Sequence, residues 1–169
     1  FCTISAHQGK FVVSRSEESV INEVKKVTHM PDFKGYISDL GGPSANMYRM
    51  KGINEEVCKV CRRPSCLHPD ICKNLDTDHA PLTALYERAA CVKGVKKVTI
   101  GSGIRYDFLD QDNKKNHFRE YFKNLVKNHV SGRLKVAPEH TDAEVLKIMR
   151  KPDYNLFDRL YRDFNRINK

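Results

Sequence analysis

The sequence predicts an α/β fold with parallel strands. Short apolar strands alternate with amphipathic helices along its 169 residues, and a glycine or proline turn follows each strand. A parallel crossover needs a dozen or more residues, and here a helix fills each connection. A closed eight-unit barrel takes about 250 residues, so the chain is either a small open sheet or a piece of a larger barrel. The last apolar helix has no strand after it, which favours the piece.

The N-terminal part is expected to contain one helix and one strand. Ser16 can cap the helix, and the two glutamates after it suit the positive end of the helix dipole. The helix should end near residues 30–31. A buried strand is expected over residues 36–40, because the turn formed by Gly41, Gly42 and Pro43 stops it. The apolar stripe of the helix consists of Val20, Ile21, Val24 and Val27.

The pattern resumes after residue 80. A helix is expected from Pro81 to Gly94, followed by a strand over 97–100 that runs into Gly101-Ser102-Gly103. Next come a helix and a strand over 134–137. The apolar side of that helix consists of Phe118, Tyr121, Phe122, Leu125 and Val126.

Two helices close the chain. The Thr141-Asp142-Ala143-Glu144 sequence reads as a capping box in which the Thr141 and Glu144 side chains each accept a backbone amide, so a helix should run to about residue 150. A last helix follows Pro152. The expected core residues of the two helices are Val145, Leu146, Met149, Phe157, Leu160, Tyr161, Phe164 and Ile167.

In residues 46–80 the apolar residues follow neither the helical nor the strand periodicity. We interpret this segment as an insertion within the single domain 1–169. Four of the six cysteines lie there, as Cys58-x2-Cys61-x4-Cys66-x5-Cys72, with His68 inside the motif. Two sulfurs on one turn can reach one ion, and two more complete a tetrahedral set. Disulfides are the alternative, but nothing indicates secretion. We therefore expect a metal site, with zinc and an iron–sulfur cluster both open.

The neighbours of these thiols are basic, and we expect them to lower the thiol pKa values. The sixth cysteine, Cys91, lies beside apolar helix positions and is expected to be inert core. The basic neighbours are Lys59, Arg62, Arg63 and Lys73.

Charge and hydropathy limit the classes of function that this protein can have. The net charge is +9, and residues 113–169 carry 14 of the 30 basic side chains. We interpret this excess of basic residues as a solvated helix face. The alternative, which we favour less, is a phosphate-binding surface. Uncharged runs of about nine residues are too short for a membrane helix, which needs about 20. The first residues do not show the basic start and apolar run of a signal peptide, so we expect none in this stretch. We expect a cytoplasmic protein without a membrane partner, and the opening Phe1-Cys2, without Met, suggests a start inside a longer protein.

Three turns are the first places to look for a ligand. Parallel α/β folds bind ligands beyond the carboxyl ends of the strands. The three turns are residues 41–44, 101–105 and 138–140. One glycine pair is weak evidence because turn geometry alone explains it. Three such turns on one rim exceed what turn geometry requires.

These stretches resemble the radical S-adenosylmethionine (SAM) superfamily, in particular its uncharacterised YgiQ-like branch and, more distantly, the methylthiotransferases. Phe1-Cys2 resembles the end of the Cys-x3-Cys-x2-Cys cluster motif, whose first two cysteines would precede residue 1. The resemblance covers nearly the whole chain. The other stretches that carry it are 7–16, 39–46, 101–105, 136–141 and the cysteine insertion.

The resemblance implies a partial TIM-type barrel with a 4Fe-4S cluster, one of whose ligands is Cys2, and with bound SAM. Gly41, Gly42 and Pro43 would lie where the family has Gly-Gly-Glu. Pro43 replaces the acidic residue, so only a backbone contact is implied there. Ser102 would lie near the ribose or carboxylate of SAM. The further implied contacts are Arg105, Glu139 and, as a carboxylate partner, Arg150.

For Glu139 and Arg150, an ordinary structural role is as well supported as a role in binding SAM. Glu139 can be a solvated loop acid, and Arg150 a cation at a helix C-terminus. The resemblance also leans toward an auxiliary cluster at the insertion, whereas the insertion's lack of other organising structure suits zinc equally. One cysteine cannot hold a 4Fe-4S cluster, so the 169-residue chain by itself is expected to be inactive.

Two functions remain. The first is a fragment of a radical SAM enzyme that cleaves SAM reductively to a 5'-deoxyadenosyl radical, acts on an unknown substrate and works with flanking segments of the same protein. The second is a zinc-stabilised RNA-binding module that uses the basic C-terminal third. No aromatic residue lies between Cys58 and Cys72 to stack a base, which disfavours the second. Hydrolase and nucleotidase motifs are absent.

Overall fold

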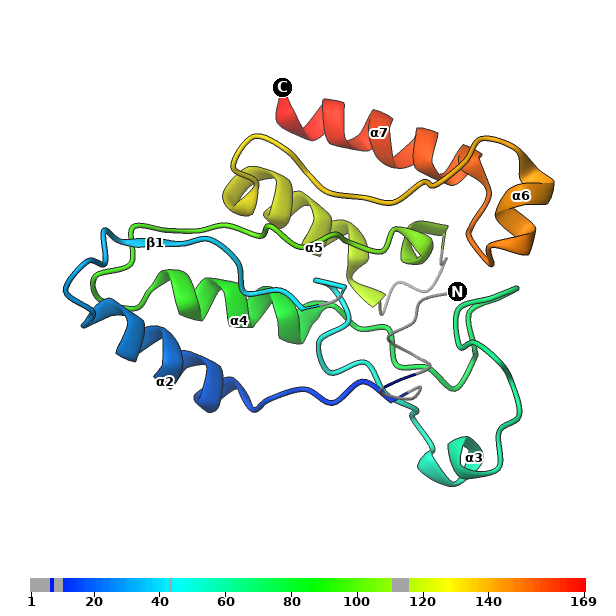
Figure 1. The fold of residues 1–169 in the computed structure, drawn as a ribbon, viewed down its shortest axis with the longest axis horizontal. Coiled ribbons are helices and arrows are strands. Elements are labelled where there is room, and N and C mark those ends of the chain that lie inside the picture. Colours follow the sequence, from blue (N-terminus) through cyan, green and yellow to red (C-terminus); the bar gives the residue numbers. More distant parts are fainter. Residues whose placement is uncertain (1–6, 8–10, 43, 111–115) are drawn as a thin grey trace.

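A computed structural model describes residue 7 and residues 11–42, 44–110 and 116–169 (Figure 1). Helices dominate these residues. The elements, in chain order, are α2 (Glu17–Thr28), β1 (Tyr36–Ile37), α3 (Glu55–Lys59), α4 (Ala80–Ala90), β2 (Lys97–Val98), the 3-10 helix η1 (Asp107–Asp110), α5 (Phe118–Asn124), the π-helix η3 (Leu125–His129), α6 (Ala143–Ile148) and α7 (Tyr154–Asn168).

The sheet confirms the α/β class and the parallel order. Strands β1 and β2 pair in parallel, with Tyr36 opposite Lys97 and Ile37 opposite Val98. Both strands are shorter than expected. The third expected strand, over residues 134–137, is wrong: that segment is extended chain without strand pairing, and its link to the loop beyond β2 is a bond from the Ile104 N–H to the Lys135 carbonyl (3.0 Å).

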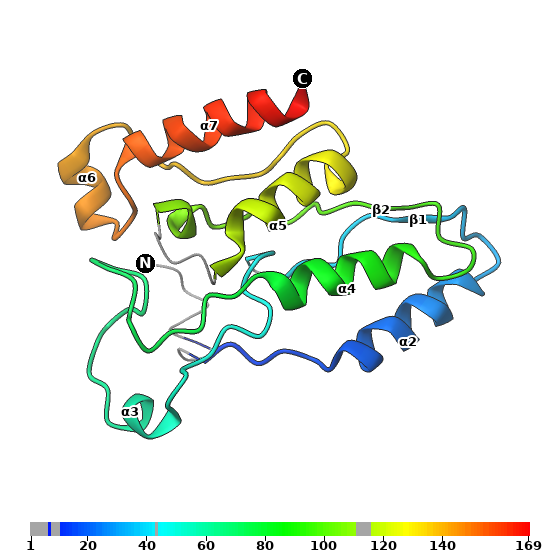
Figure 2. The same cartoon turned by 180° about the vertical axis from the view of Figure 1, so that it is seen from behind.

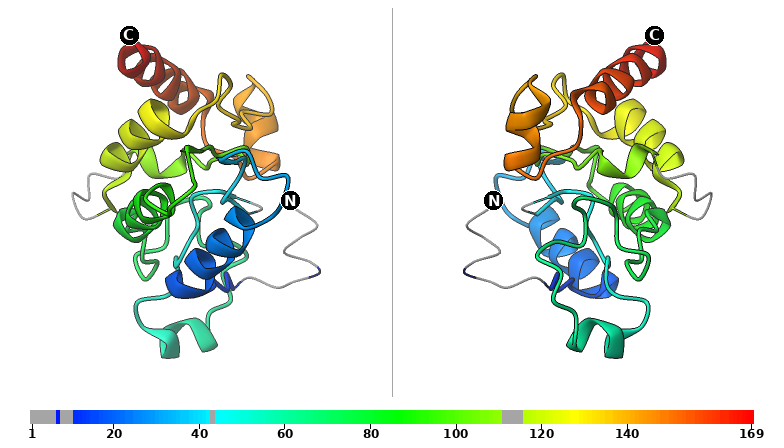
Figure 3. Two further views of the ribbon diagram at one scale, coloured as in Figure 1. Left: turned by 90° about the vertical axis from the view of Figure 1, so that its left-hand side faces the viewer. Right: turned by 90° about the vertical axis from the view of Figure 1, so that its right-hand side faces the viewer.

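Four helices stack in chain order beside the strands. Figures 1 and 3 show α2, α4, α5 and α7 lying side by side in that sequence. The first of them begins as predicted, because Ser16 Oγ accepts the Ser19 N–H at 3.2 Å. Its apolar stripe turns Ile21 and Val24 into the core. Strand, helix and turn therefore alternate as the sequence indicates as far as β2, but no strand follows α5 and η3.

Helix α6 begins differently from the prediction. Asp142, not Thr141, is the N-cap, and its Oδ1 accepts the N–H groups of Glu144 (3.0 Å) and Val145 (3.1 Å). A capping carboxylate serves two helical amides at once and interacts favourably with the helix dipole. The capping-box prediction is therefore wrong by one residue. Of the three expected core residues of this helix, Leu146 is the buried one.

The core is rich in aromatic side chains. The largest buried ones come from α4, η1 and α5, and they pack between these elements. Helix α7 contributes Leu156 and Leu160, while Tyr161, an expected core residue, is 58% exposed. None of the helices in the described ranges is long and apolar enough to cross a bilayer. The buried Phe and Tyr residues in the described ranges are Tyr86, Tyr106, Phe108, Phe118, Tyr121 and Phe122.

Candidate functional site

The first two predicted turns meet beyond the carboxyl ends of β1 and β2. Asp39 joins them, because its Oδ1 accepts the Gly41 N–H (2.7 Å) and its Oδ2 accepts the Ser102 hydroxyl (2.6 Å). The approach is so close that a Cβ on Gly41 would lie 2.7 Å from Ser102 Cβ. A Cβ added to Gly42, in contrast, would have no such neighbour within 4 Å. Both glycines are exposed, so their backbone can face a ligand.

This difference between the two glycines gives a paired prediction. Gly41→Ala should lower the free energy of unfolding by about 1–3 kcal/mol, because the new methyl group collides with Ser102. Gly42→Ala should be neutral or stabilising by up to about 1 kcal/mol, because it restricts only the unfolded chain. Urea unfolding of the full-length variants measures both. Equal losses in the two variants would contradict the tight contact between the turns.

The segment around residue 135 joins the same rim. The Ala45 N–H donates to the Gly103 carbonyl (2.9 Å), and the Ile104 N–H donates to the Lys135 carbonyl (3.0 Å). Three segments far apart in the sequence are thus tied together. The 138–140 turn itself follows on from the third segment.

Glu139 and Arg150 lie near the start and end of α6. Glu139 is exposed and forms an ion pair with Lys151 (2.9 Å). Arg150 follows the helix, and its N–H donates to the Lys147 carbonyl (3.1 Å). Both residues have a left-handed backbone, with φ of 67° and 56°. The structure thus places Arg150 after a helix C-terminus, as in its ordinary interpretation, and shows Glu139 as an exposed acid that also has a cationic partner in Lys151.

Arg105 carries an unmet hydrogen-bond donor at the rim. Its Nη2 donates to Asp107 Oδ2 at 2.7 Å, whereas its Nε is buried without a partner among the described residues. The neighbouring Tyr106 hydroxyl is also buried and unpartnered there. Burial, followed by the charges of Asp107 and Glu139, raises the pKa of Tyr106 to about 12. Unpartnered buried donors are costly, so these groups suit a bound polar ligand.

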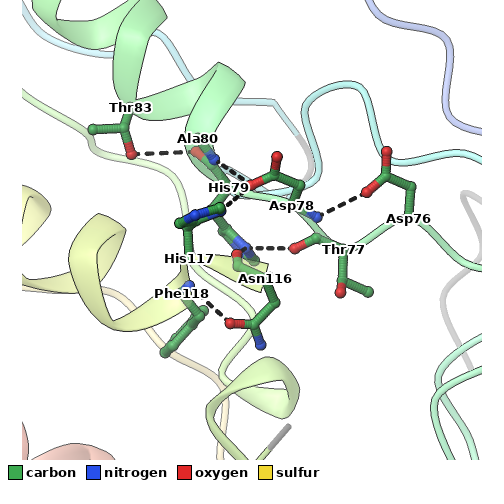
Figure 4. A network of polar contacts seen from close by, with 9 residues as sticks. All are labelled: Asp76, Thr77, Asp78, His79, Ala80, Thr83, Asn116, His117 and Phe118. Carbon is green, nitrogen blue, oxygen red and sulfur yellow. Dashed lines mark hydrogen bonds and ion pairs between the residues drawn. The ribbon is translucent and has the colours of Figure 1, made fainter. Parts of the chain in front are cut away.

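Two buried polar residues behind the rim were not predicted as site residues. Asn46 is fully buried and bonds Arg105, and its amide lies 3.2 Å from His79 Nε2. His79 belongs to the network in Figure 4, which joins the end of the insertion, the start of α4 and the turn before α5. Asn46 was visible only as part of a motif, and His79 only as one of several scattered histidines. Their pairing across 33 residues leaves no local sequence signal.

The cysteine insertion is a separate lobe closed at a narrow neck. Gly52 and Leu75 form an antiparallel bridge, flanked by a bond from the Ile53 N–H to the Asn74 carbonyl (2.8 Å). Figure 2 shows α3 projecting away from the other helices. No residue of α3 is buried. The apolar contacts between this lobe and the core come instead from Leu67, Ile71 and Leu75, which are partly buried against it.

The four insertion cysteines carry free thiols. The Cys61 N–H donates to the Cys58 carbonyl (3.2 Å), and the Cys72 N–H donates to the Cys66 carbonyl (2.8 Å). Asn74 Nδ2 donates to Cys58 Sγ at 3.2 Å. Thiolates are the donor set that zinc and iron–sulfur clusters use. Within the described ranges, however, no three His, Cys, Asp or Glu side chains are grouped as ligands of one ion.

The pKa prediction for these thiols is wrong for Cys66. Burial raises the pKa of the Cys66 thiol, and the other three insertion cysteines raise it further. Arg63 acts in the predicted direction but is the smallest of the causes. The other three cysteines therefore change the pKa of Cys66 more than Arg63 does.

Cys91 is exposed, so its prediction as buried core is also wrong. It follows α4 and lines a surface groove of about 640 Å³ between α2 and α4. Cys91 keeps a helical backbone, but it lies about 200° around the helix from the buried Ala89, so its side chain faces away from the core. Two other predicted site residues, Cys2 and Pro43, lie outside the described residues.

Comparison with known proteins gives relatives along the whole chain. The chain is 58% identical over 173 residues to a UPF0313 protein of Bacteroides thetaiotaomicron, and 45% identical over 170 residues to the UPF0313 protein YgiQ of Salmonella typhimurium and of Escherichia coli. All of this chain is covered, but only 28%, 23% and 22% of those proteins. No family model matches, and no solved structure does.

Proposed function

We propose that this segment, whose similarity to UPF0313 proteins supports a place in the YgiQ-like family, belongs to a radical SAM iron–sulfur enzyme that cleaves SAM reductively. The observation that carries the proposal is the meeting of the glycine turns at residues 41–42 and 101–103 beyond two parallel strands. Parallel α/β folds bind ligands at this edge. The segment would be part of a larger partial barrel, and its substrate is unknown.

The residues at this rim have polar groups of the types that could bind SAM. The exposed glycine backbone can approach an adenosyl or amino group closely, and Ser102 offers a hydroxyl held by Asp39. Arg105 supplies an unmet donor for a carboxylate. Glu139 and Arg150 would complete the polar shell, although Glu139 would have to share its carboxylate with Lys151. Each of these residues binds or orients the ligand.

The proposed cluster would be held by Cys2 and by two cysteines that precede residue 1. When bound, it supplies the electron that breaks the sulfur–C5' bond of SAM and leaves methionine and a 5'-deoxyadenosyl radical. Closure of the rim around SAM would exclude water from this reactive product.

The test uses the full-length protein, reconstituted with iron and sulfide without oxygen and reduced with dithionite. Wild-type protein should convert SAM to 5'-deoxyadenosine, measured by liquid chromatography and mass spectrometry. Cys2→Ala should abolish this product, while Cys91→Ala, which removes an exposed thiol elsewhere, should keep it. A wild-type protein that holds no iron and forms no 5'-deoxyadenosine, yet binds RNA with steep salt dependence, would instead favour the RNA-binding module.

We further propose that Cys58, Cys61, Cys66 and Cys72 bind one metal centre, either zinc or an auxiliary iron–sulfur cluster. The support is the all-thiol donor set, the absence of buried side chains in α3, and the Asn74 amide directed at Cys58 Sγ. An amide donor to a ligating sulfur is a common supporting contact in such sites. Binding would require the four thiols to close around the metal.

A further inference from the structure

The backbone of Arg105 is held on both sides by one buried side chain. The Arg105 N–H donates to Asn46 Oδ1 at 2.7 Å, and the Arg105 carbonyl accepts from Asn46 Nδ2 at 2.8 Å. Asn46 has no exposed surface. Because the same amide makes both bonds, residue 105 cannot move relative to the 41–46 segment without breaking them. Asn46 therefore fixes the second glycine turn against the first.

His79 reinforces the orientation of the Asn46 amide that the Arg105 backbone requires. His79 Nδ1 lies 2.8 Å from the Thr77 carbonyl and 2.9 Å from the Asn116 carbonyl, and Figure 4 shows the ring between these segments. Carbonyls only accept, so Nδ1 carries the proton. His79 Nε2 is then an acceptor, and the group facing it at 3.2 Å must be the amino group of Asn46. The reversed amide would place its oxygen against Nε2.

The surroundings of His79 keep it neutral and rigid. The ring packs against Phe108, Phe118 and Tyr121, with centroid distances of 5.0–5.2 Å. Burial lowers the pKa of His79 to about 4. Nε2 therefore remains an acceptor for Asn46 at neutral pH.

The Arg105 side chain is oriented but incompletely bonded. Asp107 holds Nη2, the side chain is 28% exposed, and Nε has no partner in the described part of the chain. A guanidinium held in this way has donors left for a planar anion.

We propose that Asn46 and His79 are positioning residues that hold Arg105 so that its guanidinium binds the carboxylate at the amino-acid end of the ligand. This inference rests on the proposed function, since SAM supplies that carboxylate. Asn46 and His79 act through the backbone of Arg105 and do not themselves touch the ligand.

The experiment measures SAM half-saturation and turnover in the reconstituted full-length protein. Asn46→Ala and His79→Asn should each raise the half-saturating SAM concentration about tenfold or more, with a smaller effect on turnover. Arg105→Gln should remove the wild-type preference for SAM over decarboxylated SAM. His79→Gln should retain near wild-type half-saturation, because its side-chain oxygen can accept from Asn46 where Nε2 does.

The matched control is His129→Asn, which also removes a buried histidine. His129 Nδ1 lies 2.9 Å from the Val98 carbonyl, so its loss should lower stability without changing SAM half-saturation or the carboxylate preference. If Asn46→Ala does not fold, the His79→Asn and His79→Gln pair decides. Wild-type half-saturation in His79→Asn, or an intact preference in Arg105→Gln, overturns the inference and leaves the proposed function standing. A wild-type protein that neither binds nor cleaves SAM overturns both.

Discussion

Replacing both Cys58 and Cys72 by serine should remove an entire metal centre from the full-length protein. Serine does not replace thiolate as a ligand of zinc or of an iron–sulfur cluster, and two of four ligands are lost. Structural zinc contributes about 10–16 kcal/mol of apparent folding free energy in small zinc domains. Helix α3 has no buried side chain, so the part of the lobe around it depends most on the metal, whereas Leu67 and Ile71 also pack against the core. We therefore expect residues 53–74 of the lobe to become protease-sensitive.

The metal content per chain is measured by inductively coupled plasma mass spectrometry, and the protease sensitivity by limited proteolysis. The double variant should lose a single zinc ion, or about four iron atoms if the site holds a 4Fe-4S cluster. Cys91→Ser is the matched control, because this exposed thiol lies in the groove between α2 and α4. Identical metal content in the wild type and the double variant would refute the metal centre while leaving the SAM rim untouched.

Acidification should destabilise the fold through His79. Burial lowers the pKa of His79 from its ordinary value of 6.5 to about 4 in the folded protein. Between these values the unfolded chain binds the extra proton and the folded chain does not. This stabilisation is therefore complete above pH 6.5 and is lost as the pH falls toward 4. The pKa difference corresponds to about 3 kcal/mol of unfolding free energy.

The size of this effect depends on the groups that face the ring. The Asp78 charge and the two carbonyls that bond Nδ1 raise the pKa of His79, and His117 lowers it, but burial outweighs them all. His129 is buried too, its pKa is lowered for the same reason, and it should add to the slope.

Urea unfolding of the full-length protein at several pH values measures the slope, and His79→Gln isolates the contribution of this residue. The variant should show a shallower decline between pH 7 and pH 4 than the wild type. Equal slopes would mean that His79 has the same pKa in the folded and the unfolded chain.

The helices could be predicted because their signals are local. Ser16 capping and the apolar stripe of α2 lie within one segment, and the same holds for α4 and α7. Strand lengths could not be predicted, because pairing depends on which distant segments approach. Residues 134–137 have a strand-like composition, but the backbone bond that joins them to the chain beyond β2 is at residue 135. Cys91 was misjudged because it lies about 200° around the helix from the buried Ala89 and so does not share its apolar face.

The site divides in the same way. Gly41, Ser102 and Arg105 could be predicted from motifs, and the structure brings them to one rim. Asn46 and His79 acquire their roles only through contacts across 33 and 59 residues, which no spacing rule encodes. The insertion motif predicts a thiol donor set for a metal, and this stays a prediction, because the relative placement of the two cysteine pairs depends on the loop between them.

The neck at Gly52 and Leu75 has a consequence for the origin of the lobe. Because the chain leaves and re-enters the body at one bridge, a short turn can connect residues 51 and 76, whose backbones already bond at 2.8 Å. The lobe is therefore modular: it can be excised, transplanted or exchanged as a cassette, and evolution could have acquired it in one step without rebuilding the host sheet.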